Sequence, residues 1–293
     1  MKDFKGKTAF ITGGAEGIGY NIGRALARQG MNVMLADIDT TLLAEAVRTL
    51  KGEALKVEGV PLDVAVKEEW ALAAEKTIAA AFGKVHLLVG NAGVVATGSQ
   101  KYISEQDWRW VIDVNLMGIV YGAQVFAPLM KSHGEGGHIL NVASMAGIHG
   151  VPFSGPYCAT KAAVVSLSEC WRTELKRDGI GVSVLCPGFV QSRIYDSMRN
   201  RQVRYGGPIY HDDVVKEKPD RKYNKELVVT GIDTEIAANR VLEGLQNDEF
   251  FIFTHPHYRE LHQMRVKEMD AGFDRADVSP ALVDVPRKGV ILT

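Results

Sequence analysis

The sequence predicts an α/β fold, with a parallel sheet of about seven strands wound in both directions and covered by helices on both faces. Short apolar runs alternate along the chain with longer segments whose apolar residues recur at helical spacing. Several of the short runs are apolar throughout, which is typical of parallel strands buried on both faces. A glycine-rich turn joins the first strand directly to the first helix. We therefore expect a doubly wound sheet.

Each expected element follows from a local pattern. The expected strands are the apolar runs at 8–11, 32–36, 54–61, 86–90, 138–143, 180–185 and 250–254. The expected helices are the periodic segments at 18–29, 40–50, 67–81, 105–131, 157–177, 234–247 and 258–273. Thr40 or Thr41 is expected to cap the second helix, and Gly83 to end the third.

Composition limits the classes of function. The chain has 293 residues, 46% hydrophobic and 24% charged, with a formal net charge of −1, so nothing favours binding to nucleic acid or to an anionic membrane. No apolar run approaches the length of a membrane span, and residues 1–5 do not resemble a signal peptide. The three cysteines, Cys158, Cys170 and Cys186, lack metal-binding spacing and indicate reduced thiols. We expect one cytoplasmic domain over 1–293.

The glycine-rich turn Thr12–Gly19 follows the first strand and opens the first helix. That context directs backbone N–H groups and the positive end of a helix toward one point, where a pyrophosphate can bind. Asp37 ends the second strand about 20 residues further on, where an acidic side chain suits the ribose diol of NAD and repels the extra phosphate of NADP. Glu16 and Asp39 add negative charge and favour NAD further.

A second group of residues carries acid–base chemistry. Tyr157 and Lys161 are four residues apart, so they share one face of the expected helix. A nearby ammonium favours the phenolate and brings a tyrosine closer to acting as an acid or base at neutral pH. Ser144 ends an apolar strand and can donate a hydrogen bond to a carbonyl oxygen. The alternative is a helix with a half-buried tyrosine and an exposed lysine.

Together these residues resemble the short-chain dehydrogenase/reductase family, a Rossmann-type fold. The family pattern T-G-x-x-x-G-x-G, N-A-G, N, S, Y-x-x-x-K is matched by Thr12–Gly19, Asn91–Gly93, Asn115, Ser144 and the Tyr157–Lys161 pair. The resemblance covers roughly residues 3–190. Two positions depart from the pattern: Gly90 stands where the family usually has a second asparagine, and Ser192 where it usually has threonine.

The resemblance implies roles for residues of this chain. Asn115 is expected to distort its helix and hold a water that links the lysine to solvent, with Ser144, Tyr157 and Lys161 as its catalytic partners. Asp63 is expected to bind the adenine amino group, although it could equally be a helix cap. The expected cofactor-binding residues are Gly13, Glu16, Gly17, Ile18, Gly19, Asp37, Ile38, Asp63, Val64, Asn91, Ala92, Gly93, Tyr157, Lys161, Pro187, Gly188, Val190 and Ser192.

Two segments lie outside the strand–helix alternation. Residues 193–231 mix basic and acidic side chains with glycine and proline, and we expect a substrate lid there, the alternative being a mobile surface loop. Residues 255–293 form a C-terminal extension. His255, His257 and His262 lie in it, but no acidic or cysteine cluster accompanies them, so we expect no metal.

The expected pocket walls are mostly apolar and aromatic, which suits a hydrophobic substrate. They comprise Val95, Met145, His149, Phe153, Phe189 and Tyr195, with Val94 and Met198 nearby. His149 could instead be an exposed loop residue. The C-terminal pattern, with Thr254–Pro256 and then Tyr258–Leu261, resembles bacterial family members that oxidise benzylic alcohols in lignin-derived aryl ethers. Steroid and fatty-alcohol substrates remain alternatives.

The expected function is hydride transfer between NAD and a secondary alcohol or ketone, with Tyr157 as general acid/base. A non-catalytic NAD-sensing protein of the same fold is one alternative, although such a protein has no reason to keep Ser144, Tyr157 and Lys161 together. A sugar-nucleotide epimerase or dehydratase is another. The family also implies a homodimer or homotetramer.

Overall fold

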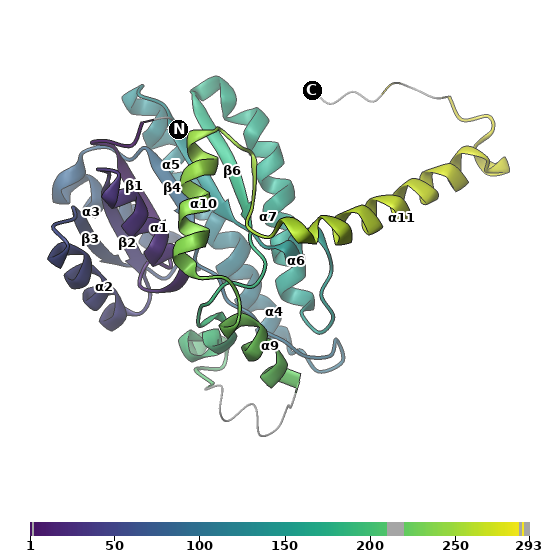
Figure 1. Cartoon of the computed structure of the whole chain (residues 1–293), viewed down its shortest axis with the longest axis horizontal. Coiled ribbons are helices and arrows are strands. Elements are labelled where there is room, and N and C mark those ends of the chain that lie inside the picture. Colours follow the sequence, from purple (N-terminus) through teal and green to yellow (C-terminus); the bar gives the residue numbers. More distant parts are fainter. Residues whose placement is uncertain (2, 210–219, 287–288, 290–293) are drawn as a thin grey trace. The chain divides into compact units, whose positions relative to one another are not determined.

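The structure is a computed structural model that describes residues 1, 3–209, 220–286 and 289, and it divides into two units, 1–255 and 256–293. The first unit contains one seven-stranded sheet in the order β3-β2-β1-β4-β5-β6-β7, with every neighbouring pair parallel (Figure 1). The strands are β1 (Thr8–Thr12), β2 (Asn32–Asp37), β3 (Val57–Pro61), β4 (Leu87–Gly90), β5 (Gly137–Val142), β6 (Ile180–Cys186) and β7 (Phe251–Phe253). The predicted doubly wound fold is confirmed.

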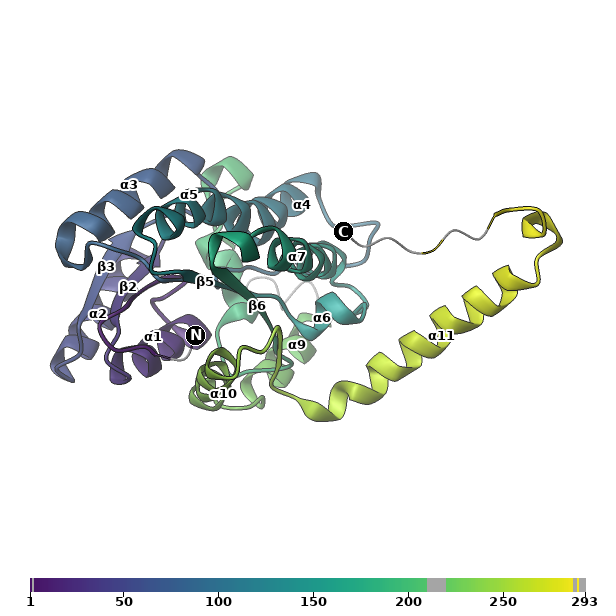
Figure 2. The ribbon, with the colours of Figure 1, turned by 90° about the horizontal axis from the view of Figure 1, so that it is seen from above.

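Helices cover both faces of the sheet, as Figure 2 shows. One layer holds α1 (Gly17–Arg28), α2 (Thr40–Gly52) and α10 (Thr234–Gln246). The other holds α3 (Lys67–Thr77), α4 (Glu105–Ile112), α5 (Gly118–His133) and α7 (Gly155–Glu174). Because strand order reverses between β1 and β4, the connections that leave the carboxyl ends of these two strands run to opposite faces of the sheet. This class of fold binds ligands in the crevice at that point.

The centre of the sheet is buried on both faces, as the apolar runs predict. All five residues of β1 and all four of β4 are buried. On one face, Phe10 of β1 packs against Trp70 and Phe126, with ring centroids 6.1 and 4.6 Å away. On the other face, Ile11 packs in a cluster with residues of α1, α2 and α10. These two cores hold the carboxyl ends of the strands in fixed positions.

Two local predictions were wrong. The third strand begins at Val57 rather than Ala54, because Ala54 has a φ of +60° and lies in the turn that ends α2. The cap of α2 is Asp39, not Thr40 or Thr41, since its Oδ1 accepts the backbone N–H of Leu42 at 3.0 Å.

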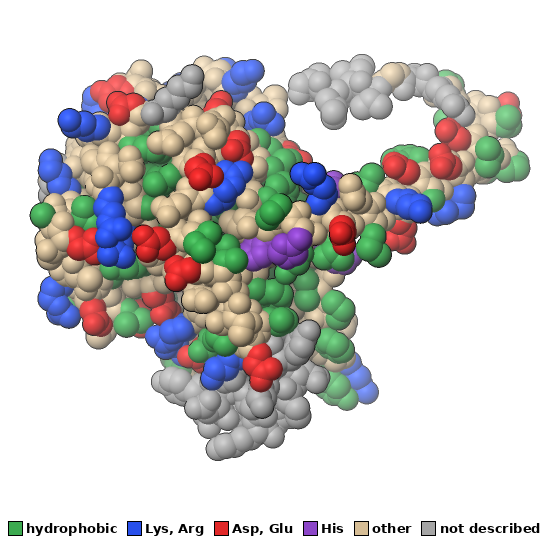
Figure 3. Space-filling view, viewed as in Figure 1, with side chains coloured by type: hydrophobic (Ala, Val, Ile, Leu, Met, Phe, Trp, Pro, Cys, Tyr) green, Lys and Arg blue, Asp and Glu red, His purple; other side chains and the backbone are tan. Residues whose placement is uncertain are grey.

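The longest helical stretch, Glu105–His133, is apolar and long enough by composition to cross a membrane, yet half of its most apolar window is buried in the protein. It comprises α4, a π-helical turn η2 (Asp113–Met117) and α5, and the last of these packs on β4 and β5. A core helix of a globular protein has the same composition. Over the described part of the face in Figure 3, acidic and basic side chains are interspersed.

The predicted lid contains short helices where it is described. They are the 3₁₀ segments η4 (Ile194–Asn200) and η5 (Val203–Tyr205) and the helix α9 (Asp220–Val229), while residues 210–219 lie outside the described part of the chain. Ser197, Met198, Arg201 and Tyr205 are buried, so the first half of the segment is packed against the rest of the first unit rather than loose on its surface. In the second unit, α11 (Arg259–Asp277) extends to Asp277, four residues beyond its predicted end, with no buried residue.

Candidate active site

The glycine turn after β1 needs glycine for two different reasons. Gly13 and Gly17 have φ angles of +62° and +64°, a region that other L-residues rarely adopt. Gly19 is in the first turn of α1, where an added Cβ would lie 2.2 Å from the Gly13 carbonyl oxygen and 2.4 Å from the Asn91 amide nitrogen. The tight turn leaves the N-terminus of α1 accessible to a pyrophosphate, and Ile18 lies in its first turn.

Thr12 and Asn91 lock this turn to the end of β4. The Asn91 side-chain amide donates to the carbonyl oxygens of Thr12 and Gly13 at 2.8 and 3.0 Å. The Thr12 hydroxyl in turn accepts the backbone N–H groups of Asn91 and Ala92, both at 3.0 Å. The ends of β1 and β4, which are about 80 residues apart in sequence, are therefore held in fixed positions by hydrogen bonds.

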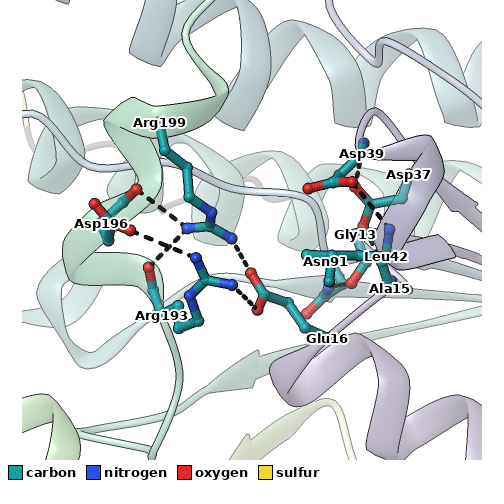
Figure 4. Close-up of polar contacts among 10 residues, drawn as sticks. All are labelled: Gly13, Ala15, Glu16, Asp37, Asp39, Leu42, Asn91, Arg193, Asp196 and Arg199. Carbon is teal, nitrogen blue, oxygen red and sulfur yellow. Dashed lines mark hydrogen bonds and ion pairs between the residues drawn. The ribbon is translucent and has the colours of Figure 1, made fainter. Parts of the chain in front are cut away.

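Asp37 faces the glycine turn from the end of β2. Its two carboxylate oxygens accept the backbone N–H groups of Ala15 and Asp39, each at 3.0 Å (Figure 4). Burial raises the pKa of Asp37, and these hydrogen bonds partly offset the rise. Ile38 follows it, half-buried. The carboxylate is thus held beside the turn, where a ribose diol can donate to its remaining lone pairs.

Glu16, which is expected to add repulsion against a second phosphate, is paired with cationic side chains of the lid segment. Arg193 and Arg199 of the lid segment both form ion pairs with Glu16, the first at 3.4 Å (Figure 4). Arg199 is also held by the carbonyl oxygens of Arg193 and Asp196, at 3.3 and 3.1 Å. Two guanidinium groups therefore offset the charge of Glu16.

Ser144, Tyr157 and Lys161 converge at the carboxyl ends of β5 and β6. Ser144 interacts with the Tyr157 hydroxyl, and its own hydroxyl donates to the Pro187 carbonyl oxygen at 3.5 Å. The Ser144 Oγ also accepts the N–H of Ala146, which caps the short helix α6 (Met145–Ile148). The Lys161 ammonium donates to the Val142 carbonyl oxygen at 2.7 Å and lies 5.7 Å from the Tyr157 ring centroid. Lys161 is 2% exposed, so the alternative of an exposed lysine is wrong.

The protonation of this pair differs from the expectation. Burial of its hydroxyl raises the pKa of Tyr157 to about 12, and the hydrogen bond from Ser144 only partly offsets that rise. Burial likewise lowers the pKa of Lys161 to about 8. Desolvation is the largest cause of both shifts, and it acts on the tyrosine in the opposite direction to the one expected from a neighbouring ammonium.

Asn115 lies in the π-helical turn η2, in agreement with the expected helix distortion. Its side chain is fully buried, accepts from the Val94 N–H at 2.8 Å and donates to the Val94 carbonyl oxygen at 2.9 Å and to Thr160 at 3.2 Å. A Cβ added at Gly93 would lie 3.4 Å from the Lys161 nitrogen and 3.5 Å from the Asn115 Oδ1. Asn115 and Lys161 therefore border the same small space.

The remaining cofactor-site predictions lie at the same edge of the sheet. Asp63 and Val64, after β3, are both buried. After β6, the Pro187 carbonyl oxygen accepts the Met145 N–H at 2.9 Å, and Val190 forms an isolated bridge to Ile232. Ser192 lies beside the glycine turn, since its Cβ is 3.5 Å from a Cβ added at Gly17.

The predicted substrate residues differ in exposure. Val95, Met145, His149, Phe189 and Tyr195 are partly buried. The Val95 N–H donates to the Ser197 hydroxyl at 2.9 Å, which ties the lid to the end of β4. Phe153 is 58% exposed with a φ of +62°, and its carbonyl oxygen accepts the Gly98 N–H at 2.8 Å. Met198, by contrast, belongs to the buried core.

Three supporting residues were not predicted from the sequence. Thr12 was quoted only as part of the turn motif, whereas it bonds both strand ends. His255 Nδ1 accepts the N–H of Gly188 at 3.2 Å and so supports the loop after β6, a role that its place after the last strand could have suggested. Arg204 pairs with Asp63 at 2.7 Å, and no local pattern indicates this contact.

Among the described residues, one group could geometrically hold a metal ion: His86, His133 and Glu135, whose ligand atoms lie within 4.8 Å of one another. His86 Nδ1 accepts the Thr8 N–H, so its Nε2 carries the proton that it donates to Glu135 at 2.9 Å. His133 Nδ1 likewise accepts the Glu135 N–H. Both rings are thus engaged in hydrogen bonds, and the group lies at the opposite edge of the sheet.

Comparisons with known proteins indicate one family. Residues 7–203 match the short chain dehydrogenase family. The chain is 34% identical over 261 residues to the C alpha-dehydrogenase of Sphingobium sp. (strain NBRC 103272 / SYK-6), which covers 89% of this chain and 84% of that protein. It is 33% identical over 273 residues to the CLA biosynthesis dehydrogenase/reductase of Lactiplantibacillus plantarum, with 92% and 95% covered.

Solved structures agree as well. A short chain dehydrogenase/reductase from Burkholderia phymatum, in complex with NAD, matches with a TM-score of 0.86 and 34% identity, and all of both chains is covered. A putative short-chain dehydrogenase from Novosphingobium aromaticivorans matches with a TM-score of 0.77 at 34% identity, over 92% of this chain and 88% of that one. This protein is therefore an oxidoreductase of the short-chain dehydrogenase/reductase family.

Proposed function

We propose that this protein transfers hydride reversibly between NAD and a hydrophobic secondary alcohol or ketone, with Tyr157 as the general acid/base. The observation that carries the proposal is the convergence of Ser144, Tyr157 and Lys161 at the carboxyl edge of the sheet, the edge that also holds the glycine turn. A protein that only senses NAD needs the turn but not this group. The full set therefore favours turnover.

The residues of the site fit NAD. Glycine at position 19, in the first turn of α1, permits a close approach to the Gly13 carbonyl oxygen that a Cβ would block. Asp37 offers carboxylate oxygens to a ribose diol and repels a 2′-phosphate. NAD, when bound, supplies the hydride acceptor for the alcohol carbon. We propose NAD rather than NADP because Asp37 provides no cationic partner for a further phosphate.

In the oxidation direction, Ser144 orients the alcohol by hydrogen bonding to its oxygen, while Tyr157 removes the hydroxyl proton. Lys161 places a positive charge close to the Tyr157 oxygen. This charge stabilises the phenolate more in the reacting complex than in the protein alone. Asn115, beside Lys161 at Gly93, supports a water-mediated path for the proton. These residues work by position and charge.

For the substrate we propose a benzylic or other aromatic alcohol. The exposed ring of Phe153 and the partly buried Phe189, Tyr195 and Met145 offer apolar and aromatic surface. The 34% sequence identity to a C alpha-dehydrogenase, over 89% of this chain, supports the same class of substrate. His149 is available as a polar anchor at the end of α6.

We also propose that residues 193–231 act as a substrate lid and that residues 1–293 form one dehydrogenase domain with 255–293 as an extension. The protein is proposed to be a cytoplasmic homodimer or homotetramer. Its three cysteines are free thiols, which suits a reducing compartment. Light-scattering mass in solution measures the oligomeric state, and a monomer would contradict this part of the proposal.

The decisive experiment is a screen for NAD reduction with purified protein. Three panels of secondary alcohols are compared: benzylic aryl-propanoids, steroids and aliphatic alcohols. We expect the highest kcat/KM in the benzylic panel. Tyr157→Phe is the matched control, since it removes a single oxygen. If NAD binds but none of the panels is oxidised, the non-catalytic alternative is favoured, whereas a steroid or aliphatic optimum would change only the substrate class.

A further inference from the structure

The lid segment reaches the far end of the dinucleotide site. Asp63 follows β3, and its side chain is 10% exposed. Arg204, in the short helix η5, forms an ion pair with its Oδ2 at 2.7 Å. The two residues are 141 positions apart in the sequence, so this contact exists only because the lid folds back over the carboxyl edge of the sheet.

Both partners of this pair are held in place. The Asp63 backbone N–H donates to Glu69 at 2.8 Å, and its Oδ1 accepts the Ala65 N–H at 3.0 Å. The Arg204 guanidinium lies 4.8 Å from the ring centroid of Tyr205. Tyr205 is buried, and its hydroxyl donates to Asp113 at 2.7 Å. The Arg204 guanidinium therefore packs on the Tyr205 ring and is directed at the Asp63 carboxylate.

This arrangement joins two parts of the site. Asp113 is the first residue of the π-helical turn η2 that carries Asn115. One ion pair, one cation–π contact and one hydrogen bond thus connect Asp63 through Arg204 and Tyr205 to the turn beside Lys161. A carboxylate buried to this degree is costly without a cationic partner, so Arg204 also makes the buried position of Asp63 tolerable.

We propose that Arg204 is a positioning residue for adenine recognition: it neutralises Asp63 and fixes its carboxylate so that a free lone pair faces the 6-amino group of the cofactor. The proposal rests on the proposed function, in which Asp63 binds adenine. It assigns to the lid a role in recognising the cofactor as well as in covering the substrate.

The test compares NAD with nicotinamide hypoxanthine dinucleotide, which carries an oxo group in place of the 6-amino group. For the natural protein we expect kcat/KM to be about tenfold higher with NAD, as suits one hydrogen bond to a charged acceptor. Asp63→Asn is expected to reduce that ratio to about one. Arg204→Met is expected to reduce it to about twofold, and Arg204→Lys, which keeps the charge, to restore part of it.

Two controls separate positioning from mere support of the fold. Tyr205→Phe removes the bond to Asp113 but keeps the ring beside the guanidinium, so it should lower the ratio less than Arg204→Met does. Arg199→Met breaks the pair to Glu16 instead of Asp63, and it should leave the ratio unchanged, whatever it does to the KM for NAD. Melting temperatures of all variants report their folding.

An unchanged or higher ratio in Arg204→Met would overturn the proposal, since the arginine would then be irrelevant or compete with adenine for Asp63. If Asp63→Asn leaves the ratio unchanged while Tyr157→Phe abolishes turnover, the adenine assignment is wrong but the hydride-transfer function holds. Full turnover by Tyr157→Phe would instead refute the proposed function itself.

Discussion

The two edges of the central sheet both bury titratable side chains, yet they differ in how those side chains are satisfied. At the amino edge, His86 and Glu135 bond to each other, and His138 bonds to Ser183 at 2.8 Å. A cavity of about 350 Å³ opens there, bordered by His86 and His138. At the carboxyl edge, the Tyr157 hydroxyl interacts with Ser144, and the Asp37 carboxylate oxygens keep lone pairs that can accept from a ligand.

The difference lies in what the polar atoms face. Each histidine at the amino edge has a hydrogen-bond partner within the protein, so its burial stabilises the fold and leaves no group for a reaction. At the carboxyl edge, helices begin and loops cross, and the partly exposed Asp37 and Tyr157 lie where this class of fold binds ligands. Burial and a shifted pKa alone therefore do not identify an active site. The predictions below test this contrast.

The largest effect is expected at the carboxyl edge. Tyr157→Phe should lower kcat about 10³-fold, because it removes the group that exchanges a proton with the substrate. The melting temperature should change little, since the ring remains in place. Steady-state kinetics and a thermal melt on the same preparation check both parts. A fall of less than tenfold in kcat would assign the proton transfer to another group.

A matched pair of glycines gives the next contrast. An added Cβ at Gly19 would lie 2.2 Å from the Gly13 carbonyl oxygen, so Gly19→Ala should raise the Kd for NAD about 100-fold. At the amino edge, a Cβ at Gly181 would lie 2.5 Å from His138 Nδ1, so Gly181→Ala should destabilise the fold by about 1–3 kcal/mol.

For this pair the measurements are calorimetric NAD binding and urea unfolding. Gly181→Ala should keep the kcat/KM of the natural protein at 25 °C, because the substitution is far from the crevice. If it impairs turnover as much as Gly19→Ala does, the separation of the two edges is wrong.

The amino edge should also make stability depend on pH. Burial lowers the pKa of His138 to about 4, with a smaller effect from the N-terminal ammonium, against about 6.5 in the unfolded chain. The unfolded state then binds more protons between these values, so stability is highest above pH 6.5 and falls as pH drops toward 4. The loss amounts to roughly 3 kcal/mol.

Burial also lowers the pKa of His86, which adds to the same trend. Urea unfolding at pH 7, 6 and 5 measures the slope, and His138→Leu should flatten it. A variant that keeps the slope of the natural protein would show that other groups cause it.

The smallest effect concerns cofactor choice. Asp37→Ala removes the carboxylate that accepts the N–H groups of Ala15 and Asp39, and it should reduce the preference for NAD over NADP about tenfold. The ratio of kcat/KM values for the two cofactors checks this. Glu16→Gln should leave that ratio nearly unchanged, because Arg193 and Arg199 already offset its charge. The opposite ranking would restore Glu16 as a specificity residue.

Much of this protein follows from short-range pattern alone. The spacing of Gly13, Gly17 and Gly19 after an apolar run specifies the turn, since a left-handed φ or a missing Cβ is a local requirement. The four-residue interval between Tyr157 and Lys161 places both on one helix face, because the period of a helix does not depend on context. The alternation of strands and helices predicts a parallel sheet covered on both faces.

Only the tertiary structure determined the ion-pair partners and the pKa shifts of the site residues. Glu16 is paired with Arg199, 183 residues away, and Asp63 with Arg204, 141 residues away, and both contacts depend on the path of the lid. The raised pKa of Tyr157 could not be predicted from the sequence either. Residue spacing predicts that a lysine is near, but not how far folding removes the hydroxyl from water. Periodicity is a property of neighbouring residues, whereas desolvation and charge pairing are properties of the whole packed chain.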